Sequence, residues 1–315
     1  MTDPHVSLIV EWDNARYREI ERARRMLRRV VEQISDLRAP VEILVVYDDL
    51  EVADGVVKGV VEEMRPAAPP DVDFLTIASP GSRYYRLKNE GARRARGALF
   101  VFVDSDILPE SGWLRALVGP FDDPKVHIVI ANTYIDTDTL YGKIFALSWY
   151  FPLRSPDGPL APTASSFVNS LAVRRSTFQR YPFPDDRELY IGQCLGHIET
   201  LQANGVGVYL NPKARVAHPP PTFFRSAIIN GHDAVIRASR SGDRLQDQAR
   251  ASYWRWRANL ESACRRIVTN HRTVDLPKTA LPVALLVAAA YYSLSCAAEL
   301  LTRATPRLVR RLYAL

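Results

Sequence analysis

The chain has 315 residues, of which 47% are hydrophobic and 24% charged, a composition typical of a folded globular protein. Its formal net charge of +6 comes from arginines spread over several segments, so we do not expect a nucleic-acid partner. The three cysteines stand far apart and indicate neither a zinc site nor a disulfide framework. The opening MTDPHVSLIVEWDN lacks the pattern of a secretory signal, so we expect a cytoplasmic protein.

Strand-like and helix-like patterns alternate through the first hundred residues. The apolar, β-rich runs are residues 5–12, 41–49, 73–79 and 98–106. The helical patterns between them are residues 15–34, 51–64 and 83–96. Strand and helix in regular succession predict an α/β fold with a doubly wound, mostly parallel sheet and flanking helices.

Acidic residues follow three of these predicted strands. The pairs are Glu11 with Asp13, Asp48 with Asp49, and Asp104 with Asp106. A single acid after a strand is usually a turn residue or a helix cap. In a doubly wound sheet, however, ligands bind at the carboxyl ends of the strands. Three acid-bearing ends on this edge therefore indicate a binding site.

The alternation weakens beyond residue 120. Residues 127–135 form a predicted strand, and 142–153 are apolar and aromatic. A loop then leads into a strand and a helix start near residue 178, and we expect this half to shape an acceptor site. Next come a helix ended by Asn204 and Gly205, a strand, and a loop at His218.

Residues 280–298 carry no charge and predict a helix near the lower limit for spanning a bilayer. Two interpretations remain open, a helix in or on a membrane and a helix packed against protein. Lys278 precedes the segment, and four arginines follow it, Arg303, Arg307, Arg310 and Arg311. These cations favour contact with anionic lipid on the cytosolic side.

Four segments, in this order, resemble family 2 glycosyltransferases with the GT-A fold. They are VSLIVEWDNARYREI, ILVVYDD, RYYRLKNEGARRARGALFVFVDSDILPESGWL and SSFVNSLAVRRSTF. The resemblance implies a glycosyltransferase domain over residues 1–222, with a nucleotide-sugar half at about 1–120 and an acceptor half at about 121–222. Residues 223–315 would form a helical C-terminal region with a membrane-associated segment at 280–298. The implied donor is a nucleotide-diphosphate sugar.

The resemblance also implies a divalent cation, Mn²⁺ or Mg²⁺, bridging the donor phosphates. Asp104 and Asp106 occupy the family's Asp-x-Asp position. We expect Asp106 to be the direct ligand and Asp104 to contact ribose or metal-bound water, because these hard cations take oxygen ligands. His218 matches a histidine that related enzymes supply to the metal or the diphosphate, although an ordinary loop histidine is an equally good interpretation.

Further donor contacts follow from the same resemblance. Asp48 or Asp49 would bind the base of the nucleotide, and Glu11 or Asp13 would border the same pocket. Asn89, with Lys88 or Arg83, lies at the start of the predicted basic helix, where a helix N-terminus favours phosphate.

The sequence departs from the family where the catalytic base is usually found. Counting back from Gly205, the family's acidic pair falls on Gln193 and Cys194, and neither can act as a carboxylate base. Loss of a general base costs about 10²–10⁴-fold in rate if nothing replaces it. The candidates for replacement are Asp185, Asp186 and Glu188 in the preceding loop, Glu199 further along the helix, and His197. Alternatively, the acceptor is acidic enough, like a phosphate, to need no base.

These features predict a metal-dependent enzyme that transfers a sugar, with inversion, to a glycan or lipid-linked acceptor. We expect it in the cytoplasm or at the inner face of the cell membrane. The alternative is a catalytically impaired protein that binds nucleotide sugars without the acidic base. A nucleotidyltransferase is a weaker third hypothesis, because VEWDNAR does not supply a glycine- and basic-rich nucleotide loop.

Overall fold

The structure, a computed structural model, describes residues 5–16, 20–37, 39–164, 167–186, 188–190, 193–240, 245–306 and 309. The chain forms two compact units. The sheet unit comprises Met1–Tyr134, Arg154–Asp185 and Cys194–His218. The helical unit comprises Ile135–Leu153, Asp186–Gln193 and Pro219–Leu315. The last segment of the helical unit starts at Pro219, and its other two segments lie within residues 1–222, the range expected for the glycosyltransferase domain.

The sheet has the strand order β3-β2-β1-β4-β8-β6-β9-β5, with β7 paired to β9. Its first four strands in the chain are β1 (Val6–Glu11), β2 (Val41–Tyr47), β3 (Asp73–Ala78) and β4 (Leu99–Asp104). All pairings among these four strands are parallel, as the alternating pattern predicts. The later strands are β5 (Leu108–Pro109), β6 (Ile128–Ile135), β7 (Ala161–Pro162), β8 (Ser170–Arg174) and β9 (Val208–His218). Strand β8 runs antiparallel to β4 and β6, and β9 antiparallel to β5.

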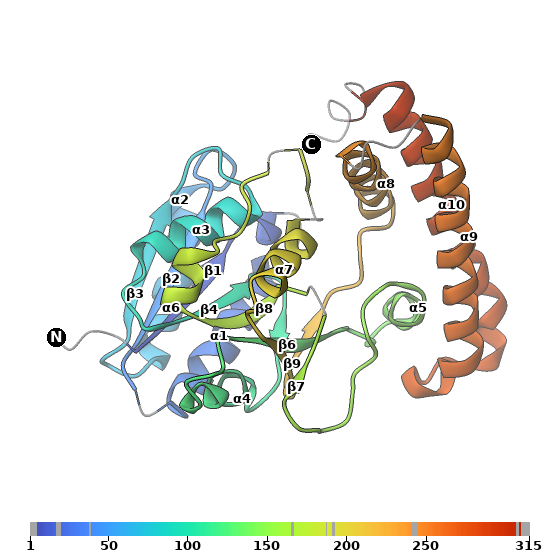
Figure 1. Ribbon diagram of the computed structural model, residues 1–315. Coiled ribbons are helices and arrows are strands. Elements are labelled where there is room, and N and C mark those ends of the chain that lie inside the picture. The colour runs from blue at the N-terminus through green and yellow to red at the C-terminus, as the bar shows by residue number, and fades with distance from the viewer. Residues whose placement is uncertain are drawn as a thin grey trace. The chain divides into compact units, whose positions relative to one another are not determined.

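Helices cover both faces of the sheet (Figure 1). They are α1 (Ile20–Ile34), α2 (Asp54–Met64), α3 (Tyr84–Arg94), α4 (Trp113–Val118), α6 (Arg175–Arg180) and α7 (Gln193–Ala203). Within β1, Leu8 and Val10 join the core that contains α1, α2 and α4, whereas Ile9 joins the core that contains α3, α6 and α7. Successive side chains of a strand point to opposite faces, so both faces of β1 are apolar and buried.

Several boundaries differ from the sequence-based expectation. Residues Asn14–Arg16 form a 3-10 turn before α1, and α2 starts at Asp54 instead of residue 51. His218 is the last residue of β9 and does not lie in a loop. The predicted end of α7 is correct, since the helix stops at Ala203 and Gly205 has φ 73°, a left-handed conformation that glycine adopts without a steric cost.

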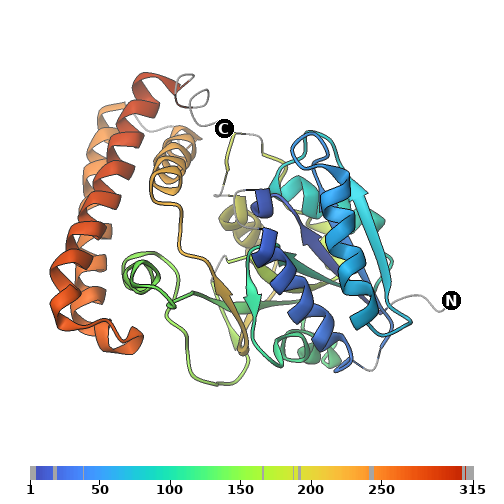
Figure 2. The ribbon, with the colours of Figure 1, turned by 180° about the vertical axis from the view of Figure 1, so that it is seen from behind.

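The helical unit contains α5 (Leu140–Ser148), α8 (Phe223–Arg240), α9 (Leu245–Asn270) and α10 (Leu281–Ala304). The last two helices lie side by side in both views (Figures 1 and 2). Gly231 of α8 packs closely on α10, because a Cβ there would come within 2.5 Å of the Ser295 carbonyl oxygen. The uncharged segment 280–298 thus forms most of a long helix, as predicted.

Candidate active site

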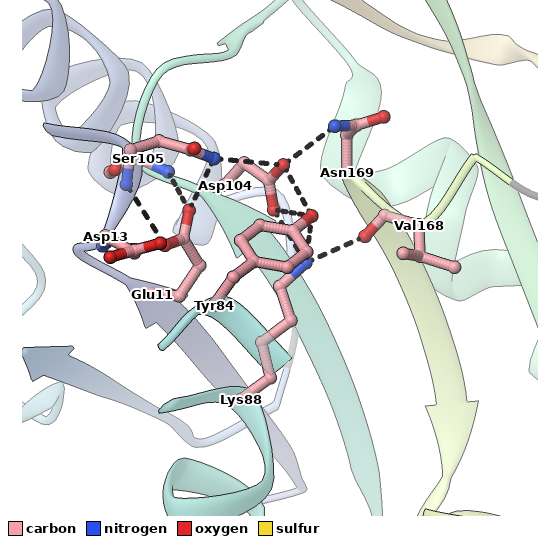
Figure 3. Close-up of polar contacts among 9 residues, drawn as sticks. Glu11, Asp13, Tyr84, Lys88, Asp104, Ser105, Val168 and Asn169 are labelled. Atoms are coloured by element: carbon pink, nitrogen blue, oxygen red, sulfur yellow. Dashed lines mark hydrogen bonds and ion pairs between the residues drawn. The ribbon is translucent and has the colours of Figure 1, made fainter. Parts of the chain in front are cut away.

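Strands β1 and β4 are neighbours in the sheet and bring two acids together. Glu11 pairs in register with Asp104 at the carboxyl ends of these strands, and both side chains are completely buried. Side chains from α3 and from the residue before β8 also form hydrogen bonds to Asp104 (Figure 3). Its Oδ1 accepts from Lys88 Nζ at 2.6 Å, and its Oδ2 accepts from Asn169 Nδ2 at 2.8 Å. The hydroxyl of Tyr84 lies 2.8 Å from both oxygens of this carboxylate.

Lys88 forms a completely buried ion pair with Asp104. Its ammonium also donates to the Val168 carbonyl at 3.0 Å and to the Tyr84 hydroxyl at 2.8 Å. Burial raises the pKa of Asp104 above its ordinary value, and the positive charge of Lys88 opposes that rise. The three hydrogen bonds of the ammonium compensate part of the cost of burying both charges.

Glu11 organises the backbone around the Asp-x-Asp turn. Its Oε2 accepts from the backbone N–H of Asp13 at 2.7 Å, and its Oε1 accepts from Asn14 Nδ2 at 2.9 Å. The same Oε1 accepts from the N–H of Ser105, the residue between the two aspartates, at 3.3 Å. Burial, and next the charge of Asp104, raise the pKa of Glu11 well above its ordinary value. Glu11 therefore fixes the backbone that follows β1 and β4.

Asp106 and His218 are brought to one edge of the sheet although they are far apart in sequence. Strands β5 and β9 pair Leu108 with Ala217, so His218 lies one residue beyond that pair, towards the Asp-x-Asp turn. Arg22 of α1 joins the two segments. Its guanidinium donates to the backbone carbonyl of Asp106, and to that of Ala217 at 3.1 Å. The Asp106 side chain is 4% exposed, and that of His218 is half-buried.

This edge supplies few ligands for a metal ion. In the described part of the chain, no group of three or more histidine, cysteine or acidic side chains is arranged to hold a cation. A carboxylate from Asp106 and an imidazole from His218 suit Mn²⁺, and the carboxylate suits Mg²⁺. A cation bound by this pair would need oxygen ligands from elsewhere, which substrate phosphates and water commonly provide.

Asp48 connects the ends of β2 and β3. Its Oδ1 accepts from the backbone N–H of Leu50 at 3.0 Å and from that of Gly81 at 2.9 Å. Asp48 is 8% exposed, whereas the neighbouring Asp49 is exposed. Asp13, the second acid after β1, is 4% exposed. The predicted acids thus do follow the strand ends, and the carboxylates of Glu11 and Asp48 accept hydrogen bonds from backbone N–H groups.

Two predicted phosphate contacts are not at the start of α3. The helix begins at Tyr84, so Lys88 and Asn89 lie in its second turn, and only the exposed Arg83 precedes it. Asn89 donates from Nδ2 to the Phe183 carbonyl at 2.9 Å and accepts from the Phe183 N–H at 3.2 Å. The expectation of a helix-start position was therefore wrong for Lys88 and Asn89. Their side chains meet polar groups of the protein instead.

Gln193, at one of the two usual base positions, closes a loop inside the helical unit. Its Nε2 donates to the carbonyls of Asp186 at 2.8 Å and Leu189 at 2.9 Å, while its Oε1 accepts from the Asp186 N–H at 3.2 Å. Glu188 is exposed, and its N–H donates to Asp186 Oδ1 at 2.9 Å. The amide of Gln193 thus has a structural role that a carboxylate could not fill completely, since it both donates and accepts.

Cys194, at the other usual base position, belongs to the sheet unit and lies against Tyr85 of α3. Burial raises the pKa of its thiol, so the thiol stays protonated at neutral pH. Asp185 and Glu199 are exposed side chains of the same unit. His197 places Nε2 2.9 Å from the Tyr181 carbonyl, and burial lowers its pKa. The candidates for a base therefore remain those given by the sequence.

The sequence did not single out four side chains that shape this site. Arg22 is one of several arginines in the first predicted helix, and neither Tyr84 nor Asn14 marks a motif by itself. Asn14 Nδ2 lies 3.5 Å from Asp104 Oδ2. Asn169 lies in SSFVNSLAVRRSTF, one of the segments that resemble the family, and its place there is the sequence feature that could have pointed to a role in the site.

The sheet order, with β1 to β4 parallel and β8 antiparallel beside β4, is that of the GT-A class of glycosyltransferase folds. A family model described as glycosyl transferase family 2 matches residues 16–179, more than half of the chain. The chain therefore belongs to glycosyl transferase family 2, as the sequence motifs predicted. This membership confirms the recognised family and, with the structural neighbours, the α/β fold class.

Two similar curated proteins are the pre-mycofactocin glycosyltransferases of Mycobacterium tuberculosis strains CDC 1551 and H37Rv. Each is 29% identical over 165 residues, which are 50% of this chain and 35% of the relative. The chain thus spans about a third of the length of these relatives. Among solved structures, the Pyrobaculum calidifontis mannosyltransferase PcManGT, in complex with GDP-Man and Mn²⁺, matches with a TM-score of 0.57 and 18% identity. That match covers 98% of this chain and 89% of the other.

A second solved structure is Staphylococcus aureus TarS 1-349 in complex with UDP. It matches with a TM-score of 0.51 and 13% identity, covering 95% of this chain and 91% of the other. At these identities the two structural likenesses establish the fold alone. Because the two matches cover 98% and 95% of this chain, both include its helical C-terminal region.

Proposed function

We propose that this protein transfers a sugar from a nucleotide-diphosphate donor to an acceptor, with inversion at the anomeric carbon. The observation that carries the proposal is the placement of Asp106 and His218 at one sheet edge, tied together by the Arg22 guanidinium. Because the chain belongs to a glycosyltransferase family, we assign sugar transfer to the site at that edge. The mannosyltransferase with GDP-Man and TarS with UDP support a nucleotide-linked donor.

We propose that Asp106 and His218 hold Mn²⁺ or Mg²⁺, with the donor diphosphate and water supplying the remaining ligands. A bound cation would stabilise the negative charge that develops on the departing nucleotide diphosphate. The Mn²⁺ in the mannosyltransferase complex supports this choice of cation. Asp104, already paired with Lys88, would contact the donor ribose or a metal-bound water through its carboxylate.

The remaining donor contacts follow the strand ends. Asp48, with Asp49 beside it, would recognise the base of the nucleotide, because Asp48 sits where β2 and β3 end. Glu11 and Asp13 would border the pocket from β1. Arg83, exposed just before α3, is a suitable cation for the donor phosphates, and Lys88 acts through its ion pair with Asp104.

The acceptor is a glycan or a lipid-linked molecule. Gln193 and Cys194 offer no carboxylate, so we propose one of two routes for the acceptor proton. Either an acid among Asp185, Asp186 and Glu188 takes it, with Glu199 a less favoured candidate, or the acceptor is an ionised phosphate that needs no base. A base-dependent reaction would lose about 10²–10⁴-fold on removal of that acid, whereas a phosphate acceptor would be unaffected.

The second candidate function is a protein that binds nucleotide sugars without transferring them, and the identity of Gln193 and Cys194 favours it. Nucleotide release from a panel of GDP- and UDP-sugars, with Mn²⁺ or EDTA and with glycan or polyprenyl-phosphate acceptors, separates the two. The enzyme predicts acceptor-stimulated release that EDTA abolishes, and an inverted anomeric linkage in the product. Donor binding without release for any acceptor would favour the binding protein.

A further inference from the structure

The outward face of α10 is uncharged along its whole length. Exposed positions recur at helical spacing, and among them are Val283, Leu286, Ala290, Ala297, Leu300 and Leu301. We call these six residues the outer face. Leu286 is 70% exposed, and Leu300 is 52% exposed. The 24 residues of the helix span about 36 Å at 1.5 Å per residue, so this is an extended apolar strip.

The opposite face of α10 is held by the rest of the helical unit. Asn230 of α8 donates to the Tyr291 hydroxyl at 2.8 Å. Glu299, the only acid of the helix, is 4% exposed and accepts from Arg255 Nη2 at 2.9 Å and from the Ser252 hydroxyl. These contacts fix which face of α10 points outward. The helix is also apolar and long enough to cross a membrane by composition and length.

Helix α9 argues against crossing. It runs antiparallel beside α10, because Ser252 bonds to Glu299 while Trp256 donates to Ser293 at 3.3 Å. Along its exposed side α9 carries Arg257, Glu261 and Arg265. If α10 spanned a bilayer, α9 would carry these charges into the hydrocarbon region, which is unfavourable. A position on the membrane surface leaves them in water.

An aromatic edge adjoins the outer face. Trp256 reaches Ser293, an exposed residue of α10, through its indole N–H. The Tyr253 ring lies 5.8 Å from that of Trp256 and 5.4 Å from that of Trp254. Tyr253 and Trp254 are about half exposed, at 50% and 49%. Tyrosine and tryptophan favour the boundary between lipid headgroups and hydrocarbon, since each combines an apolar ring with a polar hydrogen-bonding group.

Positively charged residues precede and follow the strip in the sequence. Lys278 is exposed before α10, whereas the side chain of Arg303, in its last turn, is 10% exposed and pairs with Glu299 at 3.5 Å. Three more arginines follow in the sequence, Arg307, Arg310 and Arg311. Anionic lipid attracts such clusters, whereas a second copy of this chain would present the same positive charges. The charge pattern therefore selects a membrane over self-association as the occupant.

We propose that the outer face and its aromatic edge bind the surface of an anionic lipid bilayer, with α10 lying in the interface plane. The apolar side chains enter the headgroup boundary, and the flanking cations contact lipid phosphates. The proposal concerns the helical unit and does not depend on glycosyl transfer.

Flotation with vesicles tests it on the full chain. Vesicles of phosphatidylcholine with 30% phosphatidylglycerol are compared with pure phosphatidylcholine at low and high salt. The expected result is binding to the anionic vesicles that falls at least tenfold at high salt. The double variant Leu286→Glu, Leu300→Glu should bind at least tenfold more weakly. The control Leu140→Glu places one such charge on a leucine that is 51% exposed at the start of α5, and it should bind like the wild type.

Circular dichroism checks that all variants are folded. Equal vesicle binding by the double variant and the wild type would overturn the proposal, as would the absence of binding by the wild type. Analytical ultracentrifugation tests whether a second copy of this chain binds the outer face instead. A wild-type dimer that the double variant dissociates, without any vesicle binding, would assign the face to self-association and overturn the proposal. Donor-binding and transfer assays are separate readouts, so failure of this inference leaves the proposed function untouched.

Discussion

Lys88 Nζ lies 2.6 Å from Asp104 Oδ1, and both side chains are completely buried. The pair links the second turn of α3 to the end of β4, so the first acid of the Asp-x-Asp turn is fixed by the protein itself. Asp106 is held in another way. Its backbone carbonyl accepts a hydrogen bond from the Arg22 guanidinium, and its carboxylate is the proposed metal ligand. Lys88 thus fixes the side chain of Asp104, whereas Arg22 fixes the backbone of Asp106.

Replacing Lys88 by methionine should destabilise the protein strongly. The carboxylate of Asp104 would remain buried while its ammonium partner is lost, and breaking such a pair typically costs about 3–5 kcal/mol. Urea unfolding measures the change in the free energy of unfolding. Lys58→Met is the control, because Lys58 pairs with Asp54 at the surface and its loss should change stability little. Equal stability of the two variants would mean that the buried pair contributes nothing to folding.

Gly91→Ala should be destabilising by about 1–3 kcal/mol through overpacking. A Cβ at Gly91 would lie 2.4 Å from Ile9 Cγ2 and 3.0 Å from Val46 Cγ2, so α3 would be pushed from the sheet. Gly59→Ala is the matched control in α2, where a Cβ meets nothing within 4 Å. It should stabilise the helix by about 0.5–1 kcal/mol. Thermal unfolding of both variants checks the opposite signs.

Arg22→Met should weaken cation binding as well as the fold. The guanidinium bonds to the carbonyls of Asp106 and Ala217, and each charged hydrogen bond contributes about 1.5–3 kcal/mol. Without it, the segments bearing Asp106 and His218 lose their shared support, and we expect at least a tenfold weaker Mn²⁺ affinity in the presence of donor. Calorimetric titration measures that affinity. Arg28→Met, at an exposed position of the same helix, should match the wild type.

His197 should make stability fall as the pH decreases below about 6.5. Burial lowers its pKa in the folded state, so the unfolded chain binds the proton more readily. Its contribution is therefore fully present above the unfolded pKa and is lost as the pH falls. Urea unfolding at pH 7.5 and 5.5 should show a smaller pH-dependent loss for His197→Gln than for the wild type. An identical loss in both proteins would show that the buried imidazole does not contribute.

Local pattern predicted the sheet well because β1, β2 and β4 are apolar runs buried along their whole length and each crossover helix has one apolar stripe. It could not predict the antiparallel pairing of β5 with β9, because that depends on residues about a hundred positions apart. For the same reason Arg22 was overlooked, since its role lies in reaching two distant carbonyls and not in any motif. Lys88 and Asn89 were expected at the helix start, but α3 begins at Tyr84, so both lie in its second turn.

The role of Gln193, at one of the usual base positions, could not be predicted from the sequence for a different reason. Counting back from Gly205 leads to Gln193 and Cys194, which are the first two residues of α7, and neither side chain is a carboxylate. Nothing in the sequence indicated that the Gln193 amide closes the loop from Asp186 to Leu189. That contact depends on the backbone path of the loop.

The central claim is that Asp106 holds a cation through which a nucleotide-sugar donor binds, and a thermal-shift titration tests it most directly. Wild type and Asp106→Asn are heated with GDP- and UDP-sugars, each with Mn²⁺ or EDTA, and the exposed Asp71→Asn serves as control. A donor at 100 times its Kd stabilises the native state by about 2.7 kcal/mol. The account predicts a Mn²⁺-dependent rise in Tm for the wild type and the control and none for Asp106→Asn. An equal Mn²⁺-dependent rise in Asp106→Asn, or no rise in the wild type with any donor, would contradict it.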